Sequence, residues 1–163
     1  MTQTIVDFFS VFPPQLATFL MSLTPFGELR LSIPVAILGY NLPVEQAFLI
    51  SVIGNMIPPT IILFFASRFH KWIKDQNGFF SKKWISYLAR VQKKFQGQYQ
   101  KYGLLALAIF VGIPLPMTGA WTGSIAAFVL GLPPAKSWPY IFIGVIISGT
   151  ITILVSLGIG KIF

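Results

Sequence analysis

Two ionisable side chains lie two residues apart in an apolar part of the chain. Glu28 and Arg30 occur within the sequence Thr-Pro-Phe-Gly-Glu-Leu-Arg-Leu-Ser-Ile-Pro at residues 24–34. Carrying either charge to the centre of a bilayer costs about 3 kcal/mol on insertion scales. A buried carboxylate beside a guanidinium can titrate near the working pH, because burial and the cation shift its pKa in opposite directions. Glu28 is therefore a candidate proton site, and Arg30 offers a planar fork for a phosphate or carboxylate group.

The spacing leaves the geometry of this pair open. On an intact helix, side chains at i and i+2 do not face each other. Glu28 and Arg30 can therefore pair directly only if the backbone is unwound here, and otherwise each needs a separate partner. The alternative to a functional site is a structural ion pair that fastens this segment.

Four further residues are candidates to line a proton or substrate site. Asn55 lies in a long apolar stretch and either lines the site or forms a hydrogen bond between helices. Thr118 and Thr122 either line a pore or cap a helix, and capping is the favoured role. Trp121 could stack on the guanidinium of Arg30.

The remaining ionisable residues indicate no enzymatic or metal chemistry. Asp7 and Glu45 lie near expected membrane edges and should be solvated, and His70 should be interfacial. The chain has one His, four acidic residues and no Cys. These are too few groups for most metal or hydrolytic sites, and no zinc-protease, nucleophile-elbow or phosphate-loop motif occurs. We expect no catalytic residues, no metal and no cofactor.

Composition predicts an all-α integral membrane protein. The 163 residues are 55% hydrophobic and only 10% charged, whereas soluble domains contain about 25% charged residues. Nine of the twelve Lys and Arg residues fall in the range 68–101. By the positive-inside rule this range is cytoplasmic in a multi-pass protein of the cell membrane. The same clustering favours membrane lipids over nucleic acid as partners of the basic charge.

Prolines and glycines divide the chain into short and long helices. Residues 5–23 should bend at Pro13, and a helix should start with Thr24 as N-cap and Pro25 as its first residue. That helix ends near residue 38, which is too short to span, so it predicts a re-entrant half-helix. The residues expected to break helices or form re-entrant tips are Pro25, Gly27, Pro34, Pro58, Pro114, Pro116, Gly119 and Gly123.

The longer elements follow from the same pattern. A turn at residues 39–43 precedes a spanning helix at 44–67 that packs closely through small residues. Apolar residues recur at helical spacing from 80 to 95 among lysines, which predicts an amphipathic helix at the inner membrane surface. A broken apolar stretch at 103–131 and a final helix at about 136–163 complete the chain.

The helix breaks repeat with an offset of 91 or 92 residues: Pro25 with Pro116, Gly39 with Gly131, and Pro43 with Pro134. The chain is therefore expected to be one membrane domain of residues 1–163. It contains a first repeat at about 5–67, a basic linker at 68–101 and a second repeat at about 102–163. With the linker inside, the halves become inverted copies, each a broken re-entrant hairpin followed by a spanning helix. Paired interrupted helices of this kind point to a transport site at the bilayer midplane.

Three stretches carry a family resemblance: Pro-Phe-Gly-Glu-Leu-Arg-Leu-Ser-Ile-Pro at 25–34, Gly-Asn at 54–55 with Pro58, and Pro-Leu-Pro-Met-Thr-Gly-Ala-Trp-Thr-Gly at 114–123. Together they resemble the small multidrug export family, a branch of the DedA-like superfamily of re-entrant-loop membrane proteins. Leu31 and Met117 stand where that family commonly has glycine. The resemblance implies two re-entrant loops in an inverted repeat. It also implies a proton-coupled transporter, with some relatives linked to phosphorylated lipid carriers.

The leading hypothesis is a secondary transporter in which Glu28 handles a proton and Arg30 an anionic headgroup. One alternative is an exporter of cationic drugs, in which Glu28 is the counter-charge. Another is a non-transporting membrane scaffold with a structural Glu/Arg lock. Two full spans make a thin wall for a pore, so a homodimer is expected.

Overall fold

The computed structural model describes residues 9, 11–75, 86, 99–115 and 118–159. Over these residues every regular element is a helix, as expected, and no strand is present. The elements are α2 (Pro14–Leu23), α3 (Glu28–Pro34), the π-helix η1 (Val35–Gly39), α4 (Val44–Asp75), α6 (Tyr99–Gly112), α7 (Ala120–Val129) and α8 (Pro134–Ile159). Several predicted features lie outside the described residues: the N-terminal part of the first apolar run, Asp7, Pro116, Met117 and, except for Ser86, the amphipathic segment at 80–95.

α2 begins where the proline pair requires it. Pro13 is the N-cap, with the extended ψ of 143°, and Pro14 is the first helical residue. A proline is tolerated there because the first amide of a helix has no intrahelical acceptor. The predicted bend at Pro13 is therefore confirmed. At ten residues, α2 is about 15 Å long and cannot cross a bilayer.

The predicted start of the next helix at Thr24 and Pro25 is wrong. Thr24 is the C-cap of α2, and its hydroxyl donates to the carbonyl of Met21 (2.8 Å) and accepts from the amide of Gly27 (3.0 Å). Residues 25–27 form a turn, and α3 begins at Glu28, whose φ is +43°. This left-handed backbone interrupts helical geometry, so residues 25–27 and α3 do not form one continuous helix.

The end of this short helix lies where the sequence predicts it. Pro34 lies inside α3, and the chain continues as the π-helix η1 to Gly39. Residues 40–43 are non-helical, and Asn41 has φ +52°. A π-helix is rare and occurs mostly as a single turn within an α-helix. Here it follows Pro34 directly.

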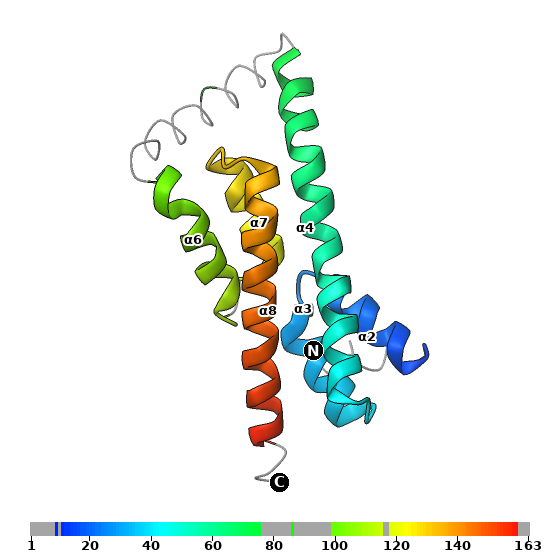
Figure 1. Cartoon of the computed structure of the whole chain (residues 1–163). Coiled ribbons are helices and arrows are strands. Elements are labelled where there is room, and N and C mark those ends of the chain that lie inside the picture. The colour runs from blue at the N-terminus through cyan, green and yellow to red at the C-terminus, as the bar shows by residue number, and fades with distance from the viewer. Residues whose placement is uncertain (1–8, 10, 76–85, 87–98, 116–117, 160–163) are drawn as a thin grey trace.

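Two long helices stand side by side and run in opposite directions, α4 and α8 (Figure 1). The predicted helix at 44–67 is confirmed, although α4 extends to Asp75 and Pro58 does not break it. Segments Val44–Phe65 and Pro134–Gly158 are long and apolar enough to cross a membrane. The indole nitrogen of Trp138 donates to the hydroxyl of Thr60 (2.9 Å), which ties the two helices together.

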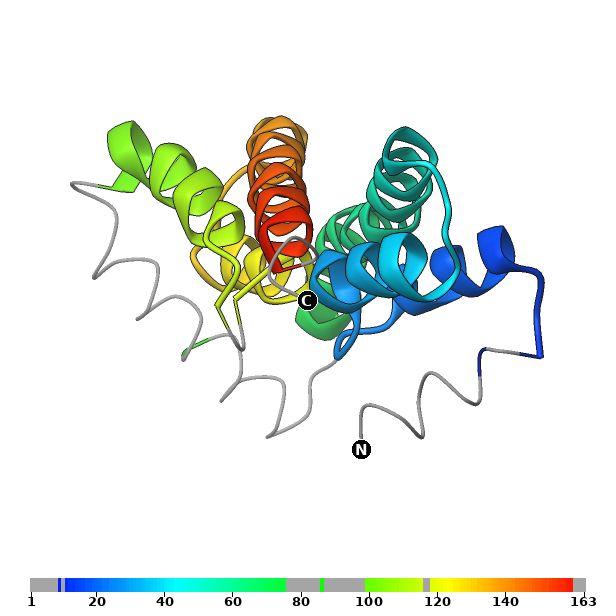
Figure 2. The ribbon, with the colours of Figure 1, turned by 90° about the horizontal axis from the view of Figure 1, so that it is seen from below.

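The shorter helices pack at opposite ends of this pair. α2 and α3 lie beside the N-terminal part of α4, while α6 and α7 lie toward its other end (Figures 1 and 2). The predicted break in the stretch 103–131 is confirmed, because α6 ends at Gly112 and α7 starts at Ala120.

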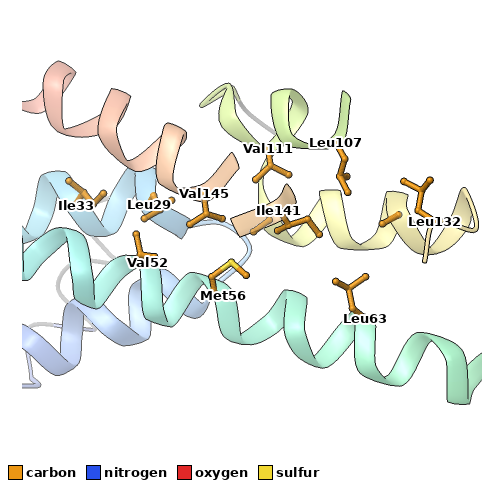
Figure 3. Close-up of a cluster of buried hydrophobic side chains, with 12 residues drawn as sticks. Leu29, Ile33, Val52, Met56, Leu63, Leu107, Val111, Leu132, Ile141 and Val145 are labelled. Atoms are coloured by element: carbon orange, nitrogen blue, oxygen red, sulfur yellow. The ribbon is translucent and has the colours of Figure 1, made fainter. Parts of the chain in front are cut away.

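The core runs along the inner faces of α3, α4, α6, α7 and α8. Figure 3 shows Leu29 and Ile33 of α3 beside Val145 of α8, with Val52 and Met56 of α4 next to them. Leu107, Val111, Leu132 and Ile141 continue it toward the α6–α7 end. The short helices α3, α6 and α7 are therefore packed to the long ones by one continuous set of apolar side chains.

Glycines let the backbones approach closely at two of these contacts. A Cβ on Gly144 of α8 would lie 2.7 Å from the carbonyl oxygen of Ala108 in α6. A Cβ on Gly54 of α4 would lie 2.9 Å from the carbonyl oxygen of Phe19 in α2. Small residues at helix interfaces have this effect in membrane proteins.

Candidate functional site

Glu28 and Arg30 pair directly, which resolves the question left open by their spacing. Nη2 of Arg30 lies 3.2 Å from Oε2 of Glu28. The left-handed backbone at Glu28 makes this i, i+2 contact possible, because it takes that residue out of regular helical geometry. The side chain of Glu28 is 8% exposed and that of Arg30 is 28% exposed.

Arg30 also binds the backbone of a segment far away in sequence. Its Nη1 donates to the carbonyl of Leu115, and its Nη2 donates to the carbonyl of Thr118. Both carbonyls belong to the loop between α6 and α7. One guanidinium therefore joins the start of α3 to the loop that precedes α7.

The carboxylate of Glu28 lies against the beginning of α7. A Cβ on Gly119 would lie 2.6 Å from both Cδ and Oε1 of Glu28 and closer still to Oε2. The backbone amide of Trp121 donates to the same carboxylate. A helix N-terminus offers unpaired amides and positive dipole potential, so Glu28 stabilises the first turn of α7. Gly119, the N-cap, has φ +144° and makes no side-chain cap.

Trp121 forms a further link between the same two segments. Its indole nitrogen donates to the carbonyl of Leu23 at the end of α2 (3.1 Å). This hydrogen bond does not involve the ring face, so the stacking of Trp121 on the guanidinium of Arg30 stays a prediction. We call the contacts of Glu28, Arg30 and Trp121 between residues 23–30 and residues 115–121 the clasp.

The two threonines have local roles. The hydroxyl of Thr118 accepts from the amide of Leu115 (3.1 Å) and lies 2.7 Å from the carbonyl oxygens of Ile113 and Leu115. The hydroxyl of Thr122 donates to the carbonyl of Gly119 (3.3 Å). Neither caps α7 in the expected way, because the N-cap is a glycine. Thr118 holds the shape of the loop that Arg30 binds.

A cavity of about 340 Å³ opens beside Arg30. Its walls come from α3, η1, the α6–α7 loop and the C-terminal half of α8: Arg30, Pro34, Leu38, Pro114, Thr152, Val155 and Ser156. Arg30 is the only charged residue among them. The hydroxyls of Thr152 and Ser156 donate to backbone carbonyls four residues earlier (2.8 and 2.7 Å), so they remain available as acceptors. The cavity combines one guanidinium, two hydroxyls and apolar walls.

A buried polar seam connects α3 to α4. The hydroxyl of Ser32 donates to the carbonyl of Glu28 (2.7 Å) and lies 2.9 Å from the hydroxyl of Ser51. Since Ser32 has only one hydrogen to give, Ser51 is the donor between them. Asn55, one turn further along α4, is 1% exposed, and its Oδ1 has no partner among the described residues.

Other predicted residues serve the scaffold. A Cβ on Gly123 would lie 2.5 Å from Val111, so this glycine allows α7 to approach α6. Glu45 is exposed, as expected. The side chain of His70 lies outside what the structure describes. Over the described residues, no group of three His, Cys, Asp or Glu side chains could hold a metal ion.

Sequence reasoning did not identify Ser32, Ser51, Thr152 or Ser156. Single serines and threonines are common in membrane helices, so their types alone carry little signal. A spacing of four residues does place Ser32 on the same helical face as Glu28, and Ser51 on the same face as Asn55. That periodicity is the signal that could have found two of the four.

The putative small multi-drug export protein family model matches residues 28–151, which is more than half of the chain. The chain belongs to this family. The match starts at Glu28 and includes Arg30, Asn55 and Trp121. Neither the curated proteins nor the solved structures returned a match. Membership of an export family, together with two apolar helices of spanning length, makes this a membrane protein.

Proposed function

We propose that the protein is a proton-coupled secondary transporter of the DedA-like type. Its substrate is a small anion or a lipid phosphate, and it is not an enzyme. The observation that carries this proposal is the clasp beside the cavity. A buried carboxylate shares its guanidinium partner with the backbone of a distant loop, at the edge of a space of about 340 Å³.

Charge balance explains how a proton and an anion would be coupled. With Glu28 ionised, its charge offsets that of Arg30 and the site is neutral. Protonation of Glu28 removes that counter-charge, and an anion in the cavity can then replace it. Proton and anion therefore bind together, because either one alone leaves a net charge in a weakly solvated site.

The same exchange loosens the clasp. Glu28 holds Arg30 in position, and Arg30 holds the carbonyls of Leu115 and Thr118. Once an anion draws the guanidinium toward the cavity, the loop before α7 loses its tie to α3. The two halves of the molecule can then move relative to each other, as alternating access requires.

The proposal includes the membrane arrangement. Both spans cross the cell membrane, with residues 68–101 in the cytoplasm. The segments α2–α3 and α6–α7 are re-entrant hairpins of an inverted repeat, which meet at the clasp. A homodimer provides the remaining wall. The placement of these short helix pairs at opposite ends of α4 and α8 supports this arrangement (Figure 1).

Transport in vesicles tests the function. Purified protein is reconstituted with an internal pH dye, and an alkyl monophosphate is added under a proton gradient. We expect wild type to carry protons with the phosphate, and Glu28→Gln to lose this coupling. Glu45→Gln is the matched control, because that acid is exposed on α4. Proton movement that is unchanged in Glu28→Gln would rule out this mechanism.

Two alternatives have specific outcomes in related assays. A cationic drug exporter predicts proton exchange with a lipophilic cationic dye, with no response to the phosphate. A non-transporting scaffold is favoured by the use of Arg30 on two backbone carbonyls. In that case Glu28→Gln/Arg30→Gln folds better than either single variant, and neither probe moves.

A further inference from the structure

The register between α3 and α4 places Asn55 level with Glu28. The two helices are connected by η1 and the turn at residues 40–43, and they run in opposite directions (Figure 1). The hydroxyls of Ser32 and Ser51 are 2.9 Å apart, which fixes the register. One turn from Ser32 toward the start of α3 is the backbone of Glu28, whose carbonyl accepts from the hydroxyl of Ser32, and one turn from Ser51 along α4 is Asn55.

Two alanines on the other side of the Ser32–Ser51 pair provide a check on this register. One turn from Ser32 past the end of α3 is Ala36, in the π-helix η1, and one turn from Ser51 toward the start of α4 is Ala47. Both alanines are 0% exposed, as expected for small residues facing each other where two helices approach closely. The burial of both alanines agrees with a register of three successive levels, and Glu28 and Asn55 occupy the level at the start of α3.

Asn55 carries an unused acceptor at this level. Only two buried side-chain polar atoms of the described residues lack a hydrogen-bond partner, Oδ1 of Asn55 and the hydroxyl of Tyr40. Leaving a buried acceptor unpaired costs about 1–3 kcal/mol. Such an atom in the interior of a native protein calls for an explanation, and a donor that is present in only one state of the protein is one.

We propose that Oδ1 of Asn55 accepts the O–H of Glu28 when that carboxyl is protonated. An ionised carboxylate has no hydrogen to donate, so Oδ1 stays unpaired in the state described here. On protonation Glu28 gains one donor, and Asn55 supplies the acceptor. Asn55 is thus a positioning residue that stabilises the proton-bound state. This inference rests on the proposed function, since it requires Glu28 to take up a proton.

The local backbone adds to the polarity of this level. Pro58 and Pro59 have no amide hydrogen, so neither can donate to the carbonyl four residues earlier, at Gly54 and Asn55. A protonated Glu28 could in principle use one of these carbonyls in place of Oδ1. A change of the Asn55 side chain separates the two, because it leaves the backbone carbonyls in place.

Among the residues that the structure describes, no other charge near this level competes with Arg30. In the elements packed around Glu28, α2 and α7 contain no charged residue, and α8 contains only Lys136 in its first turn. On α4 the nearest ionisable residues to Asn55 are Glu45 and Arg68, about 15 and 20 Å along the helix. Arg30 and Asn55 are therefore the side chains expected to influence the protonation of Glu28.

Infrared difference spectroscopy of the full chain in lipid vesicles tests the inference. A pH titration follows the carbonyl band of protonated carboxyl groups, and the band of Glu28 is the one that Glu28→Gln removes. The chain has only four acidic residues, which keeps the assignment simple. We expect Asn55→Leu to lower the midpoint of this band by about one pH unit, the equivalent of one lost hydrogen bond.

A second variant covers the risk that leucine disturbs the packing. Asn55→Asp keeps an oxygen at the same place but adds a like charge, so it should raise the midpoint. Gln46→Leu, on the exposed side of α4, is the control and should leave it unchanged.

The outcomes separate the inference from the proposed function. A lower midpoint in Asn55→Leu and a higher one in Asn55→Asp support the inference. An unchanged or higher midpoint in Asn55→Leu overturns the role of Oδ1 while leaving proton uptake by Glu28 intact. If wild type shows no Glu28 band across the titration, both the inference and the proton-coupled function fail.

Discussion

Gly119 is predicted to be the least replaceable glycine of the clasp. Gly119→Ala introduces a Cβ 2.6 Å from both Cδ and Oε1 of Glu28, in a backbone with φ +144°. The backbone region is nearly exclusive to glycine, and forcing alanine into it costs about 1–3 kcal/mol. Displacing the carboxylate adds about 1–3 kcal/mol of overpacking. We therefore expect unfolding free energy to fall by about 2–6 kcal/mol.

A double-mutant cycle separates these two contributions. Unfolding in mixed detergent micelles is followed by circular dichroism for wild type, Gly119→Ala, Glu28→Ala and the double variant. In the Glu28→Ala background the overlap is absent, so Gly119→Ala should cost only its backbone share. The coupling energy between the two sites should be about 1–3 kcal/mol, a range typical of residues in contact.

Gly158→Ala is the matched control. A Cβ at Gly158 meets nothing within 4 Å, and alanine in a helix is favoured over glycine by up to about 1 kcal/mol. This variant should be neutral or slightly stabilised. The explanation based on the Glu28 contact is refuted if Gly119→Ala costs the same in the wild-type and Glu28→Ala backgrounds.

Three further predictions concern the packing and the topology. Trp121→Phe should lower unfolding free energy by about 1 kcal/mol, because phenylalanine cannot donate to the carbonyl of Leu23; an unchanged value in the same titration would contradict this role. Gly144→Leu should destabilise by at least about 1–3 kcal/mol, because its Cβ would already lie 2.7 Å from a carbonyl oxygen of α6; wild-type stability would show that α6 moves aside freely. The chain has no cysteine, so Asn41→Cys and Lys71→Cys can each be labelled with an impermeant maleimide, and we expect reaction from opposite sides of intact membranes. Labelling from one side alone would show that α4 does not span.

The breaks between helices could be predicted because their causes are local. Pro13 sets the start of α2 whatever surrounds it, and the turn at residues 40–43 and the loop before α7 follow from glycine and proline in the same way. The long helices α4 and α8 were recognisable from unbroken apolar length. Pro58 was expected to break α4 but does not, because Pro58 and Pro59 lie on the buried side of α4, where the neighbouring helices hold the backbone in place.

The details of the site depend on contacts that are distant in sequence. The left-handed backbone of Glu28 is maintained by Arg30 and by the start of α7, so no local propensity predicts it. The partners of Arg30 are the backbone carbonyls of Leu115 and Thr118, and every residue type has a carbonyl. Glu28 and Arg30 could therefore be identified from the sequence, whereas the groups that they bind could not.

The length of α4 has a mechanical consequence. Its apolar part ends at Phe65, and the helix continues for ten residues to Asp75, about 15 Å further. The guanidinium of Arg68 stacks over the ring of Phe64, 5.2 Å from its centroid, where an interfacial cation is expected. The headgroup layer is only about 5–8 Å deep. In the membrane arrangement proposed above, the last turns of an upright α4 therefore lie in water. These turns continue the helix that contains Asn55, with Pro58 and Pro59 in between. A tilt of this end therefore either bends α4 at the two prolines or moves the level of Asn55 and Glu28.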